Sequence, residues 1–366
     1  MIATERFEKL KTYRSRYSRF EAPAFFTAGF LFDVLTVTRI DNWIQISKHV
    51  FFLVSLGWFL ILQHKSMNPQ WIPPKILNKL WPHQIRVSHF LFGNLLSAFV
   101  IFYFKSASLS KSGIFLGLVV LVMLLNEVPK VRALGLRFRL ALFSFCLASF
   151  FIYFYPLMAG FLSPFLFILA VFTATLITGF FIYRFSKSDP DPRAFQEQFG
   201  IPVLAVQFLL VMAYFFKVIP PVPLYVSFAG IYHRVEKTGD EVTLYSLRPW
   251  YRFWSHGDVT FESRDSEPVY CYVRVFAPAQ FSHQVILHWQ LYNEKLKRFE
   301  TQDRIPMQIA GGRQEGFRGY TYKSNFQSGR WRVEIETEDE RAIGDLSFTI
   351  NRDTSINPRD WRIEEG

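Results

Sequence analysis

Long apolar runs separated by short basic segments fill the first 220 residues of the chain. The runs lie at about residues 22–38, 49–63, 87–104, 113–126, 139–158, 165–183 and 201–219. Each is close to the ~20 residues that an α-helix needs to cross the hydrocarbon core of a membrane. The pattern therefore predicts a basic cytoplasmic N-terminus over 1–22 and a multi-span α-helical bundle of about seven transmembrane helices over 23–219.

The apolar pattern changes to alternation after the sequence Pro220-Pro221-Val222-Pro223. Apolar residues occupy every second position in four stretches: Val269, Cys271, Val273 and Val275; Val285, Leu287, Trp289 and Leu291; Trp331, Val333 and Ile335; Leu346, Phe348 and Ile350. Such alternation is typical of half-buried antiparallel strands. About seven short strands favour an all-β immunoglobulin-like sandwich over 230–366, with 220–229 as a proline-rich junction.

The positive charge of the chain belongs to its membrane half. Residues 1–223 hold 22 Lys and Arg against 9 Asp and Glu, whereas residues 224–366 hold 19 against 21. A nucleic-acid binder would carry its basic residues on a soluble surface. We therefore expect membrane lipid as a partner and no nucleic acid.

The distribution of Lys and Arg between the apolar runs predicts the orientation in the membrane. With the N-terminus in the cytoplasm and seven spans, 17 Lys and Arg fall in the inner segments and five in the outer ones. Cytoplasmic loops carry such an excess of positive residues. This places the C-terminal domain outside the cytoplasm, in the periplasm or the extracellular space.

Polar residues within the apolar runs raise the question of a substrate path. Asp33 and Thr36 share one face of the first predicted helix, and Asn94 contributes a smaller polar patch on the third. An ion or substrate path centred on Asp33 is one interpretation, because ionisable groups are costly in lipid. We favour the other interpretation, in which these groups form interhelical hydrogen bonds that fix the bundle.

One glycine-rich segment of the predicted β domain combines arginine with tyrosine. The segment reads GGRQEGFRGYTY and contains Arg313, Arg318, Tyr320 and Tyr322. Guanidinium groups and aromatic rings could bind an acidic polymer or a lipid headgroup. In the structural alternative, which we favour, Arg318, Tyr320 and Tyr322 lie on one face of a strand, and the glycines form a hairpin with a bulge.

The sequence gives little support to catalysis, cofactor binding or metal binding. It contains no GxSxG, HExxH, GxxxxGK[ST] or strand-linked GxGxxG motif. Its two cysteines, Cys146 in an apolar run and Cys271 in a predicted strand, exclude a disulfide framework and a cysteine-based zinc site. Histidines near helix ends form no pair that suggests haem, so we expect no cofactor and no metal.

Several stretches resemble a known family. They read VIPPVPLYVSFAGIYH, VYCYVRVFAPAQ, HWQLYN, IAGGRQEGFRGYTYKS and GRWRVEIETEDERAIGDLSFTI, with GFLFDVLTVTRID further upstream. Together they are similar to the bacterial membrane-protein family that carries domain of unknown function 2914. The resemblance implies a periplasm-facing sandwich on a multi-span anchor, and it implies no activity.

These observations predict a non-enzymatic bacterial inner-membrane protein. Its periplasmic β-sandwich would bind an envelope component or a membrane-protein partner, in a scaffold or accessory role. The alternative is a transporter or lipid-handling protein that uses Asp33 and the polar faces of the bundle. A membrane enzyme with a site at the outer helix ends is a third hypothesis.

Overall fold

The computed structural model describes residues 40–366 apart from 80, 127, 129, 130, 132, 133, 240, 253, 254, 265, 266, 279, 280 and 311–315. The chain forms two compact units. The helical unit comprises the described residues up to Phe102, Leu116–Ile152 and Phe167–Met212. The β unit comprises Tyr103–Phe115, Tyr153–Leu166 and Ala213–Gly366, so it includes short helical segments as well as all the strands.

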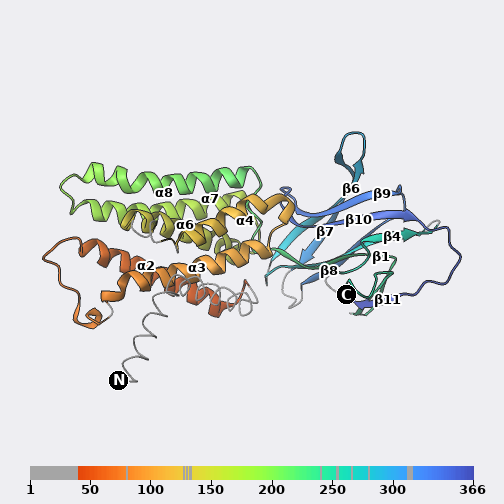
Figure 1. Cartoon of the computed structure of the whole chain (residues 1–366), viewed down its shortest axis with the longest axis horizontal. Helices are drawn as coiled ribbons and strands as arrows, with labels where there is room; N and C mark the ends of the chain where they lie inside the picture. Colours follow the sequence, from red (N-terminus) through yellow and green to blue (C-terminus); the bar gives the residue numbers. More distant parts are fainter. Residues whose placement is uncertain are drawn as a thin grey trace, which may run out of the picture. The chain divides into compact units, whose positions relative to one another are not determined.

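Apolar helices dominate the first part of the described chain (Figure 1). They are α2 (Trp43–Lys65), α3 (Gln84–Lys105), α4 (Leu109–Leu125), α6 (Leu136–Ala159), α7 (Pro164–Ser186) and α8 (Pro192–Phe215), with the short 3-10 helices η1 (Lys75–Leu77) and η2 (Trp81–His83). Five of them are long and apolar enough to cross a membrane, and α4 is shorter. Helices are therefore confirmed at six of the predicted runs, while the run at 22–38 lies outside the described residues.

The last helix does not have the predicted bounds of 201–219. It begins at Pro192 because the side chain of Asp191 accepts a hydrogen bond from the Ala194 N–H at 3.1 Å. A capping aspartate followed by proline is a strong start signal, since proline lacks only a donor that has no helical partner there. The helix ends at Phe215, and Lys217 adopts a left-handed conformation with φ of 57°. The first turns of α8 are polar, so hydropathy alone placed the start of this helix too late in the sequence.

Polar side chains inside the helical unit bond to one another across helices. Arg139 donates from Nη1 to Gln63 Oε1 at 2.7 Å, and Gln63 Nε2 donates to Ser88 Oγ at 2.9 Å. In the same unit Gln207 Nε2 donates to the backbone oxygen of Ser144 at 3.1 Å. Burying a polar group in an apolar environment is costly unless it is paired. These bonds therefore specify how α2, α3, α6 and α8 pack.

Eleven strands occur among the described residues of the β unit. They are β1 (Tyr225–Tyr232), β2 (Arg234–Thr238), β3 (Glu241–Ser246), β4 (Thr260–Ser263), β5 (Val269–Phe276), β6 (Ser282–Asn293), β7 (Arg298–Ala310), β8 (Phe317–Lys323), β9 (Gly329–Thr337), β10 (Ala342–Arg352) and β11 (Arg362–Glu365). The sheets have the orders β1-β5-β8, β4-β10-β9-β6-β7 and β11-β3-β2. Every pairing is antiparallel except that of β4 with β10.

One apolar core joins the three-stranded sheet of β5 to the five-stranded sheet of β6, β9 and β10. Cys271, Val273, Trp289 and Val333 are fully buried members of this core. The predicted alternation is confirmed for the apolar positions of β5, β6 and β9, which are buried in this core. The intervening positions lie on the opposite faces of the sheets, where Tyr272, Glu334 and Glu336 are buried as well. Trp289 also donates from its indole N–H to Thr321 Oγ1 at 3.3 Å, which satisfies the one polar atom of its side chain.

The first strand begins inside the stretch predicted as a junction over 220–229. Tyr225 already pairs with Phe276 of β5, and the two rings stack at 4.6 Å between centroids. The strand starts here because Pro220, Pro221 and Pro223 have no backbone N–H to donate, whereas the residues after them do. The proline segment therefore leads directly into the sheet.

Replacing Trp289 by alanine should destabilise the β unit severely. The side chain is fully buried, and loss of a core aromatic side chain costs about 3–5 kcal/mol because a cavity remains. The measurement is the free energy of unfolding of the detergent-purified chain, followed by near-UV circular dichroism. Trp250→Ala is the matched control, because Trp250 is 82% exposed and its loss should change the free energy by less than about 0.5 kcal/mol. Equal effects of the two substitutions would contradict this assignment of the core.

Candidate functional site

Three of the predicted binding residues share one face of β8. Arg318, Tyr320 and Tyr322 alternate along the strand; Tyr320 is 43% and Tyr322 60% exposed, whereas Arg318 is half-buried. Tyr270 of the paired strand β5 lies between the two rings, at 6.0 Å from the Tyr320 ring and 5.8 Å from the Tyr322 ring. We call Tyr270, Tyr320, Tyr322 and Arg318 the tyrosine face.

Two glycines lie beside the tyrosine face. Gly316 is required by the backbone, because its φ is +101° and a Cβ there would lie 2.8 Å from the Val275 oxygen. A Cβ on Gly319 would meet the sulfur of the Met307 side chain. The predicted hairpin is wrong, however, because β7 pairs with β6 and β8 pairs with β5 in the other sheet. Thus β7 and β8 lie in different sheets, and Gly316 allows close approach of its backbone to that of β5.

A polar cleft, not predicted from the sequence, lies on the face of β6, β7 and β9 opposite to the core. His288 of β6 stands in register with Arg304 of β7 on one side and Glu334 of β9 on the other. Glu336 follows on the same face of β9, with Oε1 3.4 Å from His288 Nδ1. The cleft has a volume of about 350 Å³.

Residues from two helical segments of the β unit complete this cleft. Lys111 from the first turn of α4 lies with Nζ 3.5 Å from Glu334 Oε1. Lys217, just after α8, donates to Glu340 at 2.6 Å, and Phe216 also lines the cleft. The outward face of β9 is consequently covered, so that the side chains of Glu334 and Glu336 are only 3% and 6% exposed.

The acidic groups of the cleft differ in how their charge is balanced. Arg304 donates to Glu336 Oε1 at 2.7 Å and to Glu340 Oε1 at 3.0 Å. Hydrogen bonds from Lys217 and Arg304 lower the pKa of Glu340 to about 2. Burial raises the pKa of Glu336, and the opposing charge of Arg304 does not offset it. The contacts of Glu334 with Gln290, Arg332 and Lys111 are all long, at 3.3, 3.4 and 3.5 Å.

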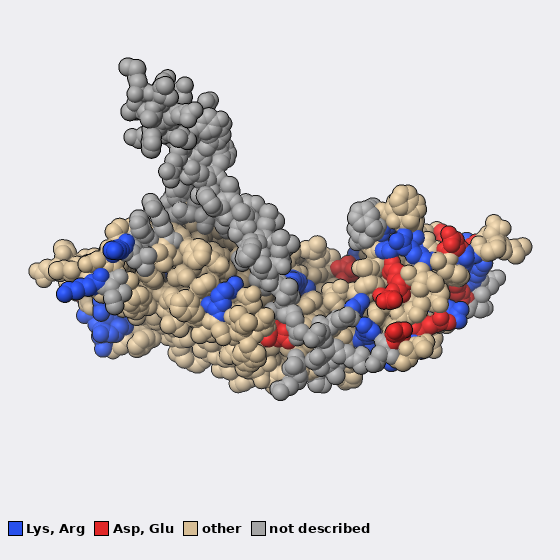
Figure 2. Space-filling view, turned by 90° about the horizontal axis from the view of Figure 1, so that it is seen from below, with Lys and Arg blue, Asp and Glu red and all other residues tan. Residues whose placement is uncertain are grey.

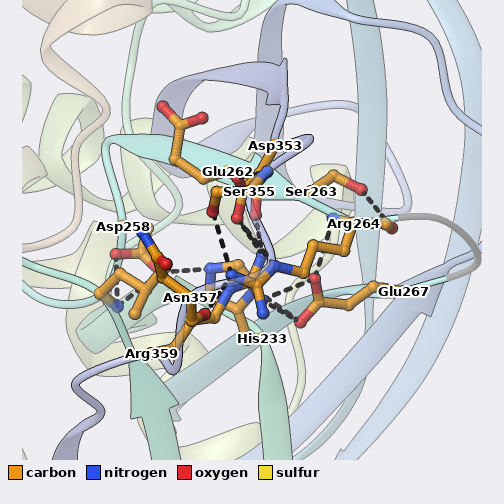
Figure 3. Close-up of polar contacts among 11 residues, drawn as sticks. His233, Asp258, Glu262, Ser263, Arg264, Glu267, Asp353, Ser355, Asn357 and Arg359 are labelled. Carbon is orange, nitrogen blue, oxygen red and sulfur yellow. Dashed lines mark hydrogen bonds and ion pairs between the residues drawn. The ribbon is translucent and has the colours of Figure 1, made fainter.

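A second buried polar cluster surrounds His233, between β1 and β2 (Figure 3). The imidazole stacks on Phe261 at 4.0 Å, and its Nδ1 lies 2.8 Å from Glu267 Oε1. Arg359 donates to both oxygens of Glu267 at 2.8 Å, and Asp258 Oδ2 lies 3.4 Å from His233 Nε2. The His233 side chain is fully buried, and the cluster ties together segments that are distant in sequence.

Burial and pairing shift the pKa values of this cluster in opposite directions. Burial raises the pKa of Asp258 to about 7 from its ordinary 3.8, although the Leu247 N–H donates to it. Burial alone would also raise the pKa of Glu267, but the hydrogen bonds from His233 and Arg359 lower it to about 2. Burial lowers the pKa of His233, which keeps the imidazole neutral.

Of the remaining predicted site residues, Asn94 is the one that lies in the described part of the chain. Arg313, Asp33 and Thr36 lie outside the described residues. Asn94 donates to the Phe90 carbonyl of its own helix at 3.1 Å, and the threonines of α7 do the same with carbonyls four residues earlier. These bonds are local and do not outline a path through the bundle.

The sequence contains part of the information needed to predict the polar cleft. His288 and Gln290 on β6, and Glu334 and Glu336 on β9, occupy the positions between the apolar ones. Such positions ordinarily face solvent. The register that places His288 beside Glu334, and the cover by Phe216 and Lys217, are long-range features that one sequence does not specify.

The helices and sheets define the class of the protein. Five helices that are long and apolar enough to cross a membrane, followed by a β-rich C-terminal region, indicate a membrane protein with a β domain. Residues 282–350 match a family model described as "Protein of unknown function (DUF2914)", which confirms the resemblance over β6 to β10. No curated protein matches the chain.

Solved structures give only remote similarity. A β-glucosidase from Listeria innocua in complex with glucose is 10% identical, with a TM-score of 0.19, over 26% of this chain and 15% of that one. A β-glucosidase from Kluyveromyces marxianus is 12% identical, with a TM-score of 0.19, over 34% and 14%. The DNA glycosylase AlkC of Pseudomonas fluorescens, bound to DNA, is 8% identical, with a TM-score of 0.22, over 86% and 99%. The chain thus spans only a small part of either β-glucosidase, and TM-scores this low carry no argument.

Replacing Asp258 by asparagine should change how stability depends on pH. Between about pH 4 and pH 7 the folded carboxyl of Asp258 keeps a proton that the unfolded chain has released, so this group stabilises the fold less as pH rises. Asp258→Asn removes that loss. The unfolding free energy of the variant should rise relative to wild type across this range, by up to about 4 kcal/mol.

The measurement is chemical unfolding of both proteins at several pH values. His233, whose pKa is lowered by burial, contributes in the opposite direction, since this group stabilises the fold more as pH rises. Asp360→Asn, at an exposed carboxylate that follows Arg359 in the sequence, should leave the difference flat. An equally flat difference for Asp258→Asn would refute the assignment.

Proposed function

We propose that the protein is a membrane-anchored binding protein, not an enzyme, whose β domain binds an acidic polymer of the cell envelope. The observation that carries this proposal is the tyrosine face, where the exposed rings of Tyr320 and Tyr322 lie beside the half-buried ring of Tyr270, and Arg318 occupies the same face of β8. We further propose that the protein resides in a bacterial inner membrane, with the N-terminus in the cytoplasm and an immunoglobulin-like sandwich in the periplasm.

The chemistry of the tyrosine face supports a polysaccharide with acidic groups. Aromatic rings present a flat apolar surface with a polar edge, which suits the faces of sugar rings. Arg318 adds a planar donor group that matches carboxylates and phosphates. The rings are already ordered by mutual packing across β5 and β8, so that little side-chain entropy remains to be lost on binding.

The charge pattern supports the proposed orientation. On the face seen in Figure 2, uncharged residues cover most of the helical unit, and Lys and Arg are interspersed with Asp and Glu over the β unit. A mixed surface of this kind suits a water-exposed domain. The excess of Lys and Arg in the inner segments of the sequence favours the cytoplasmic side for those segments.

A reporter enzyme that is active only outside the cytoplasm tests the orientation. Fused after Gly366, it should be active in a bacterial host, because seven spans from a cytoplasmic N-terminus end outside. A second reporter that is active only inside should be inactive at the same position. The opposite result for both fusions would refute the proposed orientation.

Binding to a uronic-acid polymer tests the tyrosine face. The detergent-purified chain should bind alginate more tightly than neutral dextran in biolayer interferometry. Replacing both Tyr320 and Tyr322 by alanine should weaken binding about tenfold or more, since each ring contact contributes about 0.5–1.5 kcal/mol. Arg318→Lys should weaken binding to alginate and leave binding to dextran unchanged, because lysine keeps the charge and loses the planar donor pair.

Tyr251→Ala is the matched control for this experiment. Tyr251 is exposed and lies outside the tyrosine face, in the segment between β3 and β4. Its loss should not affect binding. Unchanged alginate binding by the double tyrosine variant would overturn the proposal, and capture of a specific protein through the same tyrosines would replace the polymer by a protein partner.

A further inference from the structure

We propose that His288, Glu334 and Glu336 bind one divalent transition-metal cation in the polar cleft. One ligand atom from each of the three side chains lies within 4.8 Å of the other two. The three residues line the same cleft of about 350 Å³. This site is separate from the tyrosine face, and the inference does not depend on the proposed polymer binding.

Strand register brings the three donors together. His288 pairs directly with Glu334 across β6 and β9, so their side chains leave the sheet on the same face. Glu336 lies two residues further along β9 and therefore projects from that face as well. Because all three donors stand on neighbouring strands of a hydrogen-bonded sheet, the backbone holds them in place without an ion.

The two buried carboxylates differ in how fully the protein compensates them: Arg304 donates to Glu336 at 2.7 Å, whereas Glu334 has only long contacts. Two acidic side chains, 3% and 6% exposed, stand next to each other on β9. Charge-assisted hydrogen bonds are ordinarily about 2.7–2.9 Å long, but the contacts of Glu334 are 3.3–3.5 Å. A divalent cation would lie between the carboxylates and offset the desolvation that both incur.

The cationic side chains of the cleft can give way to a metal ion. Lys111 is 51% exposed, so its ammonium group can move into water at small cost when an ion takes its place beside Glu334. Arg304 also donates to Glu340 at 3.0 Å, so it keeps a partner if the ion draws Glu336 away. The contact between Lys111 and Glu334 is thus the one that an ion can replace most easily.

The donor set selects the class of metal. One imidazole and two carboxylates favour zinc and neighbouring first-row divalent ions over magnesium, which prefers oxygen donors and retains its water. Three protein ligands leave further coordination positions, and the cleft has room for water molecules there. The inferred site is therefore an open one, in which an exogenous ligand could reach the metal.

Calorimetric titration with Zn²⁺ tests the inference. The full chain in detergent, first treated with a chelator, should bind one Zn²⁺ and bind Mg²⁺ at least a hundredfold more weakly. Glu334→Gln and His288→Ala should each weaken Zn²⁺ binding at least tenfold. Glu300→Gln and His283→Ala, which change residues of the same kinds outside the site, should not alter it.

Lys111→Met separates a true site from a loss of folding. If Zn²⁺ displaces the lysine from Glu334, removal of the ammonium group should tighten Zn²⁺ binding several-fold, which an unfolded variant cannot do. X-ray absorption at the zinc edge should show nitrogen and oxygen ligands without sulfur. Zn²⁺ binding that is unchanged by Glu334→Gln and by Lys111→Met, or no binding at all, would overturn the inference whatever the result for the tyrosine face.

Discussion

Burial of charge on the outer face of β9 is the constraint on which the β unit depends. Glu334 and Glu336 point away from the apolar core, yet Phe216 and Lys217 help to cover them. A buried carboxylate is tolerated only with compensating partners. The sheet therefore depends on Arg304 from β7, which pairs with Glu336 at 2.7 Å, as well as on its apolar core. The polar contacts of Glu334 and Glu336, which we call the polar layer, thus join segments whose proximity the apolar pattern does not predict.

The same layer connects the strands to the helical segments of the β unit. Lys217 bonds to Glu340, Ser108 donates to Asp345 at 2.5 Å, and the guanidinium group of Arg341 lies 3.5 Å above the Tyr214 ring. These partners are more than one hundred residues apart in sequence. The sheet and the helix ends are thus held by several contacts and not only by the chain that links them.

The sequence predicted where the helices and strands lie far better than which strands pair and which side chains meet. Apolar length located the helices, and alternation located the inward positions of β5, β6, β9 and β10, because both depend on neighbouring residues alone. The start of α8 was missed because Asp191 and the polar turns after it lie outside the apolar run. The placement of β7 and β8 in different sheets was missed because glycines are compatible with a hairpin and with a change of sheet alike. On the tyrosine face, alternation sufficed for Arg318, Tyr320 and Tyr322, whereas the position of Tyr270 beside them required the pairing of two distant strands.

The two cysteines have a practical consequence for experiments on this protein. Cys146 in α6 and Cys271 in β5 are both unpaired thiols with no exposed surface, and burial raises the pKa of the Cys271 thiol. A thiol that is neither ionised nor accessible reacts slowly with maleimides and oxidants. The two natural cysteines should therefore not react in chemical labelling. A single cysteine introduced at a chosen surface position can carry a spin label or a fluorophore without prior removal of the natural ones.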